Sequence, residues 1–209
     1  MIRTLTVAAI VATAAAAVPA TAAEFSGFRA ELQGGWDNPQ ITYDAYTTNG
    51  AYIGEYHESK SGFMYGAEIG YDFPVSETVI LGVLGSIGGT TVSLDPQVFG
   101  TTITAWDVNA NVGFNWNLAA RAGFKVADNT LLYGSAGYAS TNIKYYVNET
   151  NILTTVSYED SKTYGGFLFA AGIEQAFGEK FYGKAEYRYT NYQSGVSRNQ
   201  IVFGAGMRF

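Results

Sequence analysis

The sequence predicts an all-β protein, an eight-stranded antiparallel up-and-down transmembrane β-barrel. A short apolar leader, an alternation of polar and apolar residues with a period of two, and the absence of cysteine predict it. Charged residues make up 14% of the 209 residues, against roughly 25% in an ordinary soluble domain. With 12 Lys and Arg against 18 Asp and Glu, the chain has no basic surplus for binding phosphate. We therefore expect no nucleic-acid partner.

Residues 1–23 have the features of a secretory signal peptide. Arg3 supplies the positive charge, residues 5–18 are apolar residues and Thr, and Ala20-Thr21-Ala22 has the form of a signal peptidase site. An uncleaved anchor is disfavoured because the apolar run is shorter than the ~20 residues that span a membrane as a helix. We expect cleavage after Ala22 or Ala23, which leaves a barrel domain of residues 24–209. No disulfide holds this exported chain, since it has no cysteine.

Alternation with a period of two continues through the rest of the chain. Near its middle, Trp116, Leu118 and Phe124 fall on one face, while Asn117 and Arg121 fall on the other. Eight segments share this pattern and are the predicted strands: 27–36, 62–73, 78–92, 103–125, 131–147, 152–177, 181–192 and 198–209.

The connections between these segments alternate in length. Residues 74–77, 126–130 and 178–180 are tight turns, whereas residues 37–61 form a long loop rich in Tyr, Thr and Asn. Short turns on one side and long loops on the other are typical of an up-and-down barrel. Several segments exceed the ~10 residues that a membrane requires, so we expect them to protrude as ribbons on the loop side. Asn49-Gly50 favours a hairpin within the long loop, and a ten-stranded barrel that includes this hairpin is the alternative.

The polar face mixes both signs of charge with glycine, which suits a crowded lumen where charges pair. The predicted lumen network consists of Arg29, Glu31, Glu68, Asp72, Arg121, Lys125, Glu174, Lys184, Glu186, Arg188 and Arg208. The opposite face is apolar and ends in aromatic residues, as expected of girdles at two membrane interfaces: Phe28, Trp36, Tyr71, Phe73, Tyr133, Phe177, Phe181, Tyr187 and Tyr189. A soluble lipocalin-like barrel is the alternative, and it is disfavoured because such a barrel exposes a charged face with few glycines.

The chain resembles the small outer-membrane β-barrel proteins of Gram-negative bacteria. Within them it is most similar to the alphaproteobacterial outer membrane immunogenic protein or porin-family group, related in architecture to the OmpA transmembrane domain and to Opa-like and Ail-type adhesins. Four stretches carry the resemblance: residues 119–124, 130–139, 185–189 and 206–209. The resemblance implies an outer-membrane location among lipid and lipopolysaccharide. Leu84 is a departure, because the family often has an acidic residue at that lumen position.

The C-terminus ends in an aromatic residue preceded by alternating apolar positions. Phe209, Met207 and Phe203 fit the pattern. By resemblance, this pattern implies a signal that the barrel assembly machinery reads. The simpler interpretation is an apolar residue that completes a strand.

Catalytic residues are not indicated. His57, the only histidine, lies in the long loop beside Glu58 and Ser59, and Ser93 and Asp95 belong to the next loop. Adjacent residues of a surface ribbon seldom converge on one reacting atom, although a lone histidine is a conceivable general base. We find no metal-ligand spacing, phosphate-binding loop or nucleophile elbow, so we expect no enzyme, no metal and no cofactor.

The remaining function classes are a pore, an envelope component and a surface-binding protein. Eight strands leave an interior just wide enough for side chains to fill, which disfavours a diffusion channel. The loop tyrosines Tyr43, Tyr46, Tyr52 and Tyr56 suit adaptable contact with a ligand, although they also suit the edge of a protruding ribbon. We expect a monomer with an envelope role and surface loops that bind host or envelope ligands. The alternatives are a narrow porin-like channel and a lipid A-modifying enzyme.

Overall fold

The computed structural model describes residues 25–46, 50–94, 99–100, 104–151, 155–193 and 195–209. The predicted signal peptide, Asn49 and Asp95 lie outside them. The strands are β1 (Gly27–Tyr46), β2 (Tyr52–Ser59), β3 (Gly62–Pro74), β4 (Val79–Thr90), β5 (Ser93–Leu94), β6 (Phe99–Gly100), β7 (Thr104–Ala127), β8 (Thr130–Asn151), β9 (Thr155–Phe177), β10 (Phe181–Tyr192) and β11 (Val196–Arg208). In the part of the chain that the structure describes, no helix is long and apolar enough to cross a membrane.

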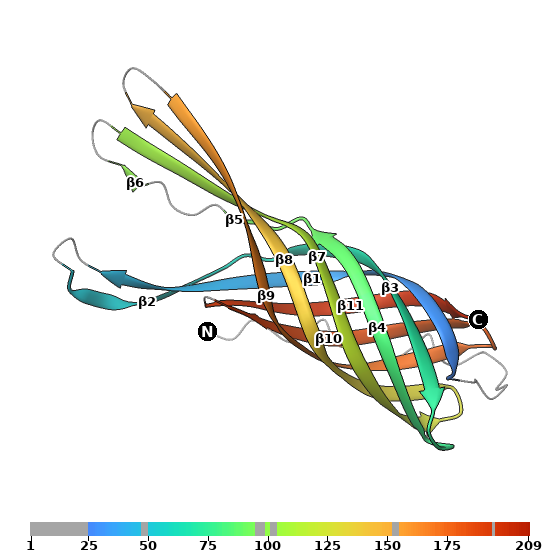
Figure 1. Ribbon diagram of the computed structural model, residues 1–209. Coiled ribbons are helices and arrows are strands. Elements are labelled where there is room, and N and C mark those ends of the chain that lie inside the picture. Colours follow the sequence, from blue (N-terminus) through green and yellow to red (C-terminus); the bar gives the residue numbers. More distant parts are fainter. Residues whose placement is uncertain (1–24, 47–49, 95–98, 101–103, 152–154, 194) are drawn as a thin grey trace, which may run out of the picture.

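Eight of these strands close into an antiparallel barrel (Figure 1). Each barrel strand pairs with the next one along the chain, and β11 pairs with β1 from Arg29↔Arg208 to Ile41↔Val196. This closure confirms the predicted eight-stranded up-and-down barrel. The ten-stranded alternative is wrong, because β2 pairs with β1 and with no other described strand.

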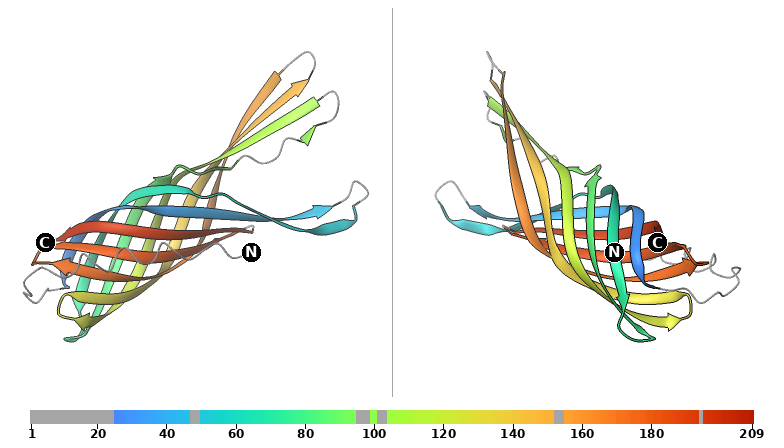
Figure 2. Two further views of the ribbon diagram at one scale, coloured as in Figure 1. Left: turned by 180° about the vertical axis from the view of Figure 1, so that it is seen from behind. Right: turned by 45° about the vertical axis from the view of Figure 1, so that its right-hand side comes forward.

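The two ends of the barrel differ, as the lengths of the connections predict. At one end, three short connections follow β3, β7 and β9, and the C-terminus lies there too (Figure 1). Gly178 has a φ of +70° in the last of these turns, a conformation that glycine adopts without steric cost. We call this the turn end. At the opposite, ribbon end, paired strands continue beyond the barrel wall (Figure 2).

Two ribbons protrude from the ribbon end. The first joins β1 and β2 through pairs from Gln40↔Ser59 to Tyr46↔Tyr52. The strand predicted to end at residue 36 therefore continues to Tyr46, and much of the predicted loop 37–61 is a β-ribbon. The second ribbon consists of the far halves of β7, β8 and β9, with β5 and β6 paired to β7. The ribbons diverge (Figure 2).

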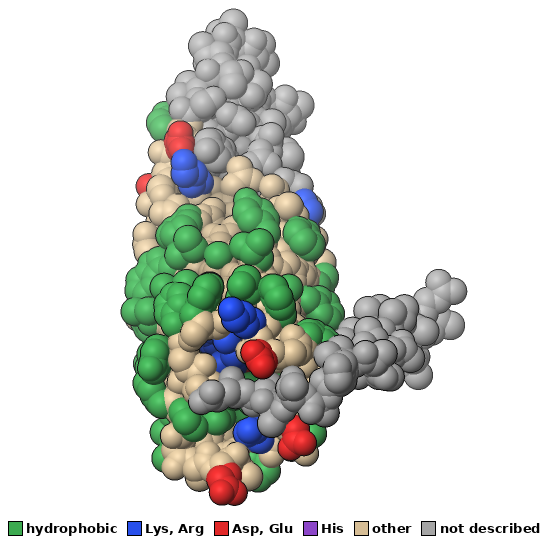
Figure 3. Space-filling view, turned by 90° about the vertical axis from the view of Figure 1, so that its right-hand side faces the viewer, with side chains coloured by type: hydrophobic (Ala, Val, Ile, Leu, Met, Phe, Trp, Pro, Cys, Tyr) green, Lys and Arg blue, Asp and Glu red, His purple; other side chains and the backbone are tan. Residues whose placement is uncertain are grey.

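The outer wall is apolar, the reverse of a soluble barrel. Leu118 is 61% exposed and its neighbour Asn117 is buried. Hydrophobic side chains cover much of the wall in Figure 3, which views the molecule from the turn end. All but one of the aromatic residues predicted for the girdles are exposed on this wall. The exposed residues are Phe28, Trp36, Tyr71, Phe73, Phe177, Phe181, Tyr187 and Tyr189. Tyr133 is that exception and corrects the prediction, because it is 5% exposed and points into the lumen.

Packed side chains fill the lumen in three zones. A small apolar cluster of Phe25, Ile80, Leu131 and Ala176 lies at the turn end. Charged residues follow. A larger apolar cluster extends toward the ribbon end and consists of Leu84, Val92, Ala119, Ala139, Ile143, Tyr164, Leu168, Tyr192 and Val196. Charged side chains are therefore enclosed between two apolar groups.

Candidate functional site

The most extensive polar arrangement among the described residues is a network of ion pairs inside the barrel. Six strands supply it: Arg29 and Glu31 from β1, Glu68 and Asp72 from β3, Arg121 from β7, Glu174 from β9, Lys184, Glu186 and Arg188 from β10, and Arg208 from β11. All are buried, because the two-residue period of each strand turns them inward. Five are cationic and five are anionic, so the network is formally neutral.

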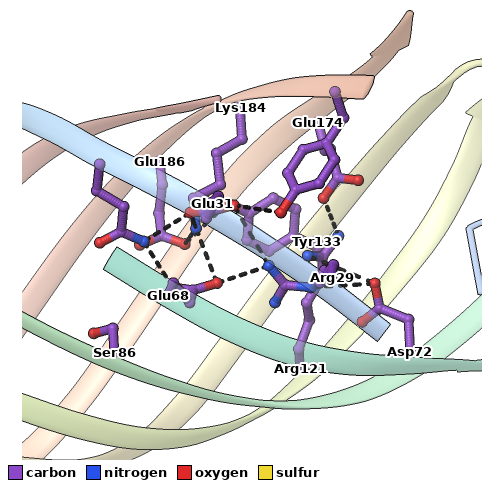
Figure 4. A network of polar contacts seen from close by, with 12 residues as sticks. Arg29, Glu31, Glu68, Asp72, Ser86, Arg121, Tyr133, Glu174, Lys184 and Glu186 are labelled. Carbon is purple, nitrogen blue, oxygen red and sulfur yellow. Dashed lines mark hydrogen bonds and ion pairs between the residues drawn. The ribbon is translucent and has the colours of Figure 1, made fainter. Parts of the chain in front are cut away.

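Glu68 is the central acceptor of the network (Figure 4). One of its oxygens accepts hydrogen bonds from Arg29 at 2.8 Å and from Lys184 at 3.1 Å. The other oxygen accepts one from the amide of Gln33, also at 2.8 Å. Strands far apart in the sequence thus meet at one carboxylate.

Glu31 contacts Lys184 and Gln33, the same two side chains that contact Glu68. Its Oε1 lies 2.6 Å from Nζ of Lys184 and accepts a hydrogen bond from Gln33 at 2.7 Å. Its Oε2 accepts a hydrogen bond from the hydroxyl of Tyr182 at 2.8 Å. Lys184 therefore lies between two carboxylates, and each carboxylate has a neutral donor besides.

A second part of the network lies nearer the turn end. Arg121 donates to Glu174 at 2.6 Å, and Arg208 pairs with Glu174 and, at 2.9 Å, with Asp72. Nε of Arg29 lies 3.3 Å from Asp72, which connects this part to Glu68. A single chain of contacts therefore runs through both parts.

Tyr133 and Glu186 form a further contact of the network. The Tyr133 hydroxyl donates to Glu186 at 2.9 Å, and the Arg121 guanidinium lies 4.1 Å from the centre of the Tyr133 ring. Arg188 donates twice to the other oxygen of Glu186, at 2.7 and 2.9 Å. Tyr133 thus contacts a cation with its ring face and an anion with its hydroxyl.

Glycines provide the space that these side chains occupy. A Cβ at Gly70 would lie 2.9 Å from the Arg29 guanidinium, and one at Gly204 would lie 2.9 Å from an oxygen of Glu31. A larger residue at either position would displace a charged group from its partner. The glycines on the polar face are therefore part of the packing of the lumen.

The chemistry of this arrangement is that of a structural core. Isolated charges are costly to bury, and here each has an oppositely charged neighbour within 4.0 Å. The side chains that neutralise one another also occupy the cross-section of the barrel. A hydrated ion would have to displace paired groups and then cross an apolar cluster.

Ten of the eleven predicted lumen charges come together in the network. Lys125 does not, since its ammonium lies 5.7 Å from the ring of Phe25 and no described carboxylate pairs with it. Sequence reasoning missed Gln33, Tyr182 and Tyr133. The pattern held a usable signal, because Gln33 lies two residues from Glu31 and Tyr182 two residues from Lys184 on the same strand face.

A separate ion pair, also missed, lies nearer the ribbon end. Arg198 on β11 donates to both oxygens of Asp37 on β1 at 2.7 Å, and both residues are buried.

Leu84, a departure from the family pattern, lies in the larger apolar cluster. Leu84 pairs with Gly70, which lies against the Arg29 guanidinium, so this position borders the network but contributes no charge to it.

The predicted surface residues lie on the first ribbon. Tyr52 is exposed, while the side chains of Tyr43, Tyr46 and Tyr56 lie outside the described part.

The residues considered for catalysis have polar partners of their own. Nδ1 of His57 lies 2.9 Å from the hydroxyl of Thr42, and its Nε2 lies 3.7 Å from Glu55. Ser93 donates to Asn111 at 2.8 Å. The described residues include no group of His, Cys, Asp and Glu that could hold a metal ion.

The C-terminal residues complete the wall at the turn end. Phe203 and Phe209 are exposed on the outer face, and Met207 is half-buried. The backbone N–H of Phe209 donates to the carbonyl of Phe28 at 2.8 Å, and the two rings lie 5.9 Å apart. The last residue thus extends the seam between β11 and β1.

An apolar outer wall around a neutral, filled lumen defines a small transmembrane β-barrel protein. The chain belongs to the outer membrane protein beta-barrel domain family, whose model matches residues 6–209. The 22 kDa outer membrane protein of Rhizobium leguminosarum is 25% identical over 75% of this chain and 72% of that protein. The 25 kDa outer-membrane immunogenic protein of Brucella ovis is 25% identical over 98% of this chain and 99% of that protein. The protein therefore lies in the outer membrane of a Gram-negative bacterium, surrounded by its lipid.

Solved structures of similar shape include two other small barrels. Ail, the attachment invasion locus protein of Yersinia pestis, is 16% identical with a TM-score of 0.47, and the match covers 88% of this chain and 99% of that chain. Neisserial surface protein A is 15% identical with a TM-score of 0.48, over 88% of this chain and 98% of that chain.

Proposed function

We propose that the protein is a monomeric, non-conducting structural barrel of the cell envelope that presents two surface ribbons as binding elements. The observation that carries this proposal is the filled lumen: a neutral network of ten buried charges, enclosed by apolar clusters at both ends. A general diffusion pore needs a continuous aqueous path, and a filled eight-stranded barrel offers none.

The first test is electrical. We expect the purified protein, refolded and inserted into planar bilayers, to show no large and stable conductance. Reproducible steps in the nanosiemens range would contradict the closed lumen and would favour the porin-like alternative. A refolded sample that shows the heat-dependent gel mobility typical of a folded barrel is the necessary control.

The ribbons carry the binding part of the proposal. Small outer-membrane barrels have short periplasmic turns and longer extracellular loops, so we place the turn end in the periplasm and both ribbons outside the cell. Long paired strands hold side chains away from the membrane and expose residues such as Tyr52 and Tyr158. Tyrosine gives a large contact area at a small entropy cost, which suits a host or envelope ligand.

The second test removes the first ribbon. Replacing residues 42–58 with a short turn removes none of the pairs of β1 with β3 or with β11, so we expect a folded barrel. In a strain lacking the protein, we expect the full chain but not the shortened chain to restore attachment to host surfaces. Equal attachment by both would contradict a binding role for this ribbon.

The same strain separates binding from catalysis. His57 lies 2.9 Å from the Thr42 hydroxyl and 3.7 Å from Glu55, but the His57 and Glu55 side chains are 70% and 51% exposed on the ribbon. Water therefore surrounds this group, whereas a catalytic hydroxyl and base act on a substrate enclosed in a pocket. We expect His57→Ala to retain attachment and to leave the mass spectrum of lipid A unchanged. A change in acyl number that depends on His57 would contradict the non-enzymatic function.

A further inference from the structure

The clearest feature that the proposed function leaves unexplained is the position of Phe25. This residue precedes the first strand, yet its side chain is only 2% exposed. Its ring lies in the turn-end mouth of the lumen and packs with Ile80, Leu131 and Ala176, which come from three different barrel strands. A residue outside the sheet thus packs inside one opening of the barrel.

Two cations flank the ring in the mouth. Cζ of Arg208 lies 5.3 Å and Nζ of Lys125 lies 5.7 Å from the ring centre, distances at which a cation is attracted to an aromatic face. The guanidinium of Arg208 also pairs with Asp72 and Glu174. Phe25 therefore contacts the last charged layer of the network. The same contact accounts for Lys125, which the network does not include.

Gly27 lets the chain turn from the wall into the mouth. Its φ is +86°, and a Cβ at this position would lie 2.6 Å from the carbonyl oxygen of Phe209. Both the conformation and the lack of space require glycine. Phe25 is thus connected to the wall through a turn that lies against the carbonyl group of Phe209.

We propose that Phe25 is a tethered stopper that closes the turn-end mouth and controls the access of small solutes to the charged lumen. The ring is held by packing and by two cations, and no strand pairing includes residue 25. It can therefore leave the mouth without any change in the barrel wall, in the way that regions outside the sheet open locally at low free-energy cost. This proposal rests on the closed lumen proposed above.

The absence of cysteine gives a direct test. Ala176→Cys places one thiol behind Phe25, and Ala139→Cys places a matched thiol in the apolar cluster nearer the ribbon end. The measurement is the rate at which a small, negatively charged methanethiosulfonate labels each folded protein in micelles. Adding Phe25→Ala should accelerate labelling at position 176 by about tenfold or more and leave position 139 unchanged, since the labelling rate reports the population of the open state.

Two further variants distinguish a stopper from general loosening of the barrel. Phe25→Leu keeps an apolar side chain in the mouth, so labelling at position 176 should stay within about threefold of the parent rate. Gly27→Ala should accelerate it, because alanine is strained at this φ and meets the Phe209 carbonyl. Equal labelling rates with Phe and Ala at position 25 would overturn the stopper, as would equal acceleration at positions 176 and 139. Rapid labelling at both positions with Phe25 present would instead contradict the closed lumen.

Discussion

Arg198 donates two hydrogen bonds of 2.7 Å, one to each carboxylate oxygen of Asp37, across the seam where the last strand meets the first. Pro39 stands directly opposite Arg198 in this seam. Backbone hydrogen bonds alternate along an antiparallel pair, and this seam has one from Phe209 to Phe28 and one from Thr42 to Gly195. In the same unbroken register, Pro39 and Arg198 form a pair whose backbone groups point away from the seam. The ion pair therefore joins the two strands beside a position where they exchange no backbone hydrogen bond.

Breaking this pair should destabilise the barrel. Asp37→Ala leaves the Arg198 cation buried without its partner, which we expect to cost about 3 to 5 kcal/mol in the free energy of unfolding. The double variant Asp37→Ala/Arg198→Leu removes both charges and should recover part of that loss. Urea-dependent unfolding in micelles measures both. A single variant as stable as the parent would contradict a structural role for the pair.

The outer wall should penalise charge according to depth. Leu118 and Leu132 are both exposed on the wall, but Leu132 pairs with residues only a few positions from a turn. We expect Leu118→Arg to cost about 2 to 4 kcal/mol in lipid vesicles and Leu132→Arg about 0 to 1 kcal/mol. Because the substitution is identical, the difference measures membrane depth. Equal costs would contradict the position of Leu118 near the middle of the membrane.

Tyr133 should contribute through its hydroxyl as well as its ring. Tyr133→Phe keeps the ring against Arg121 but removes the hydrogen bond to Glu186, so we expect a loss of about 1.5 to 3 kcal/mol, the range for bonds to charged groups. Tyr138→Phe, on the exposed wall, is the matched control and should have little effect. Similar unfolding curves for the two variants would argue against an inward Tyr133.

Phe209 should matter more for assembly than for stability. Its side chain is exposed on the wall, and its deletion leaves the pairs between β1 and β11 in place. We propose that this residue serves as a signal to the assembly machinery, and we therefore expect the shortened chain to refold in detergent but to reach the outer membrane of cells in much smaller amounts. Phe203→Ala, which changes an internal wall position, separates this effect from a general loss of apolar surface. Failure of the shortened chain in both assays would indicate that Phe209 has a purely structural role.

Alternation alone predicted most of the barrel. It placed Asn117 in the lumen and Leu118 on the wall, because one face must be polar and the other must meet lipid. It failed for Tyr133, whose aromatic character suggested a girdle although Leu131, two residues earlier, is also buried. The extension of β1 was hidden by Asn38 and Pro39, residues more typical of turns than of strand interiors.

The apolar part of the lumen could not be predicted in the same way. Ile143 and Leu168 look like lipid-facing residues in the sequence, but they pack inside. Polarity distinguishes two faces only where they differ, and near the ribbon end apolar residues occur on both. The ion pairs were only partly predictable for a related reason. Alternation indicates which charges face inward, whereas the stagger of the strands decides which of them meet.

Because the charges within the lumen balance one another, the net charge of the protein comes from residues outside the lumen network. The network and the pair of Asp37 with Arg198 are each neutral, so the entire formal charge of −6 belongs to residues beyond them. An approaching partner therefore encounters an acidic molecule, although its interior is rich in arginine. Association with another anionic surface should be slow at low ionic strength and faster with added salt, which screens repulsion beyond about 10 Å at 0.1 M. Divalent cations should favour the same contact by bridging carboxylates on the two surfaces.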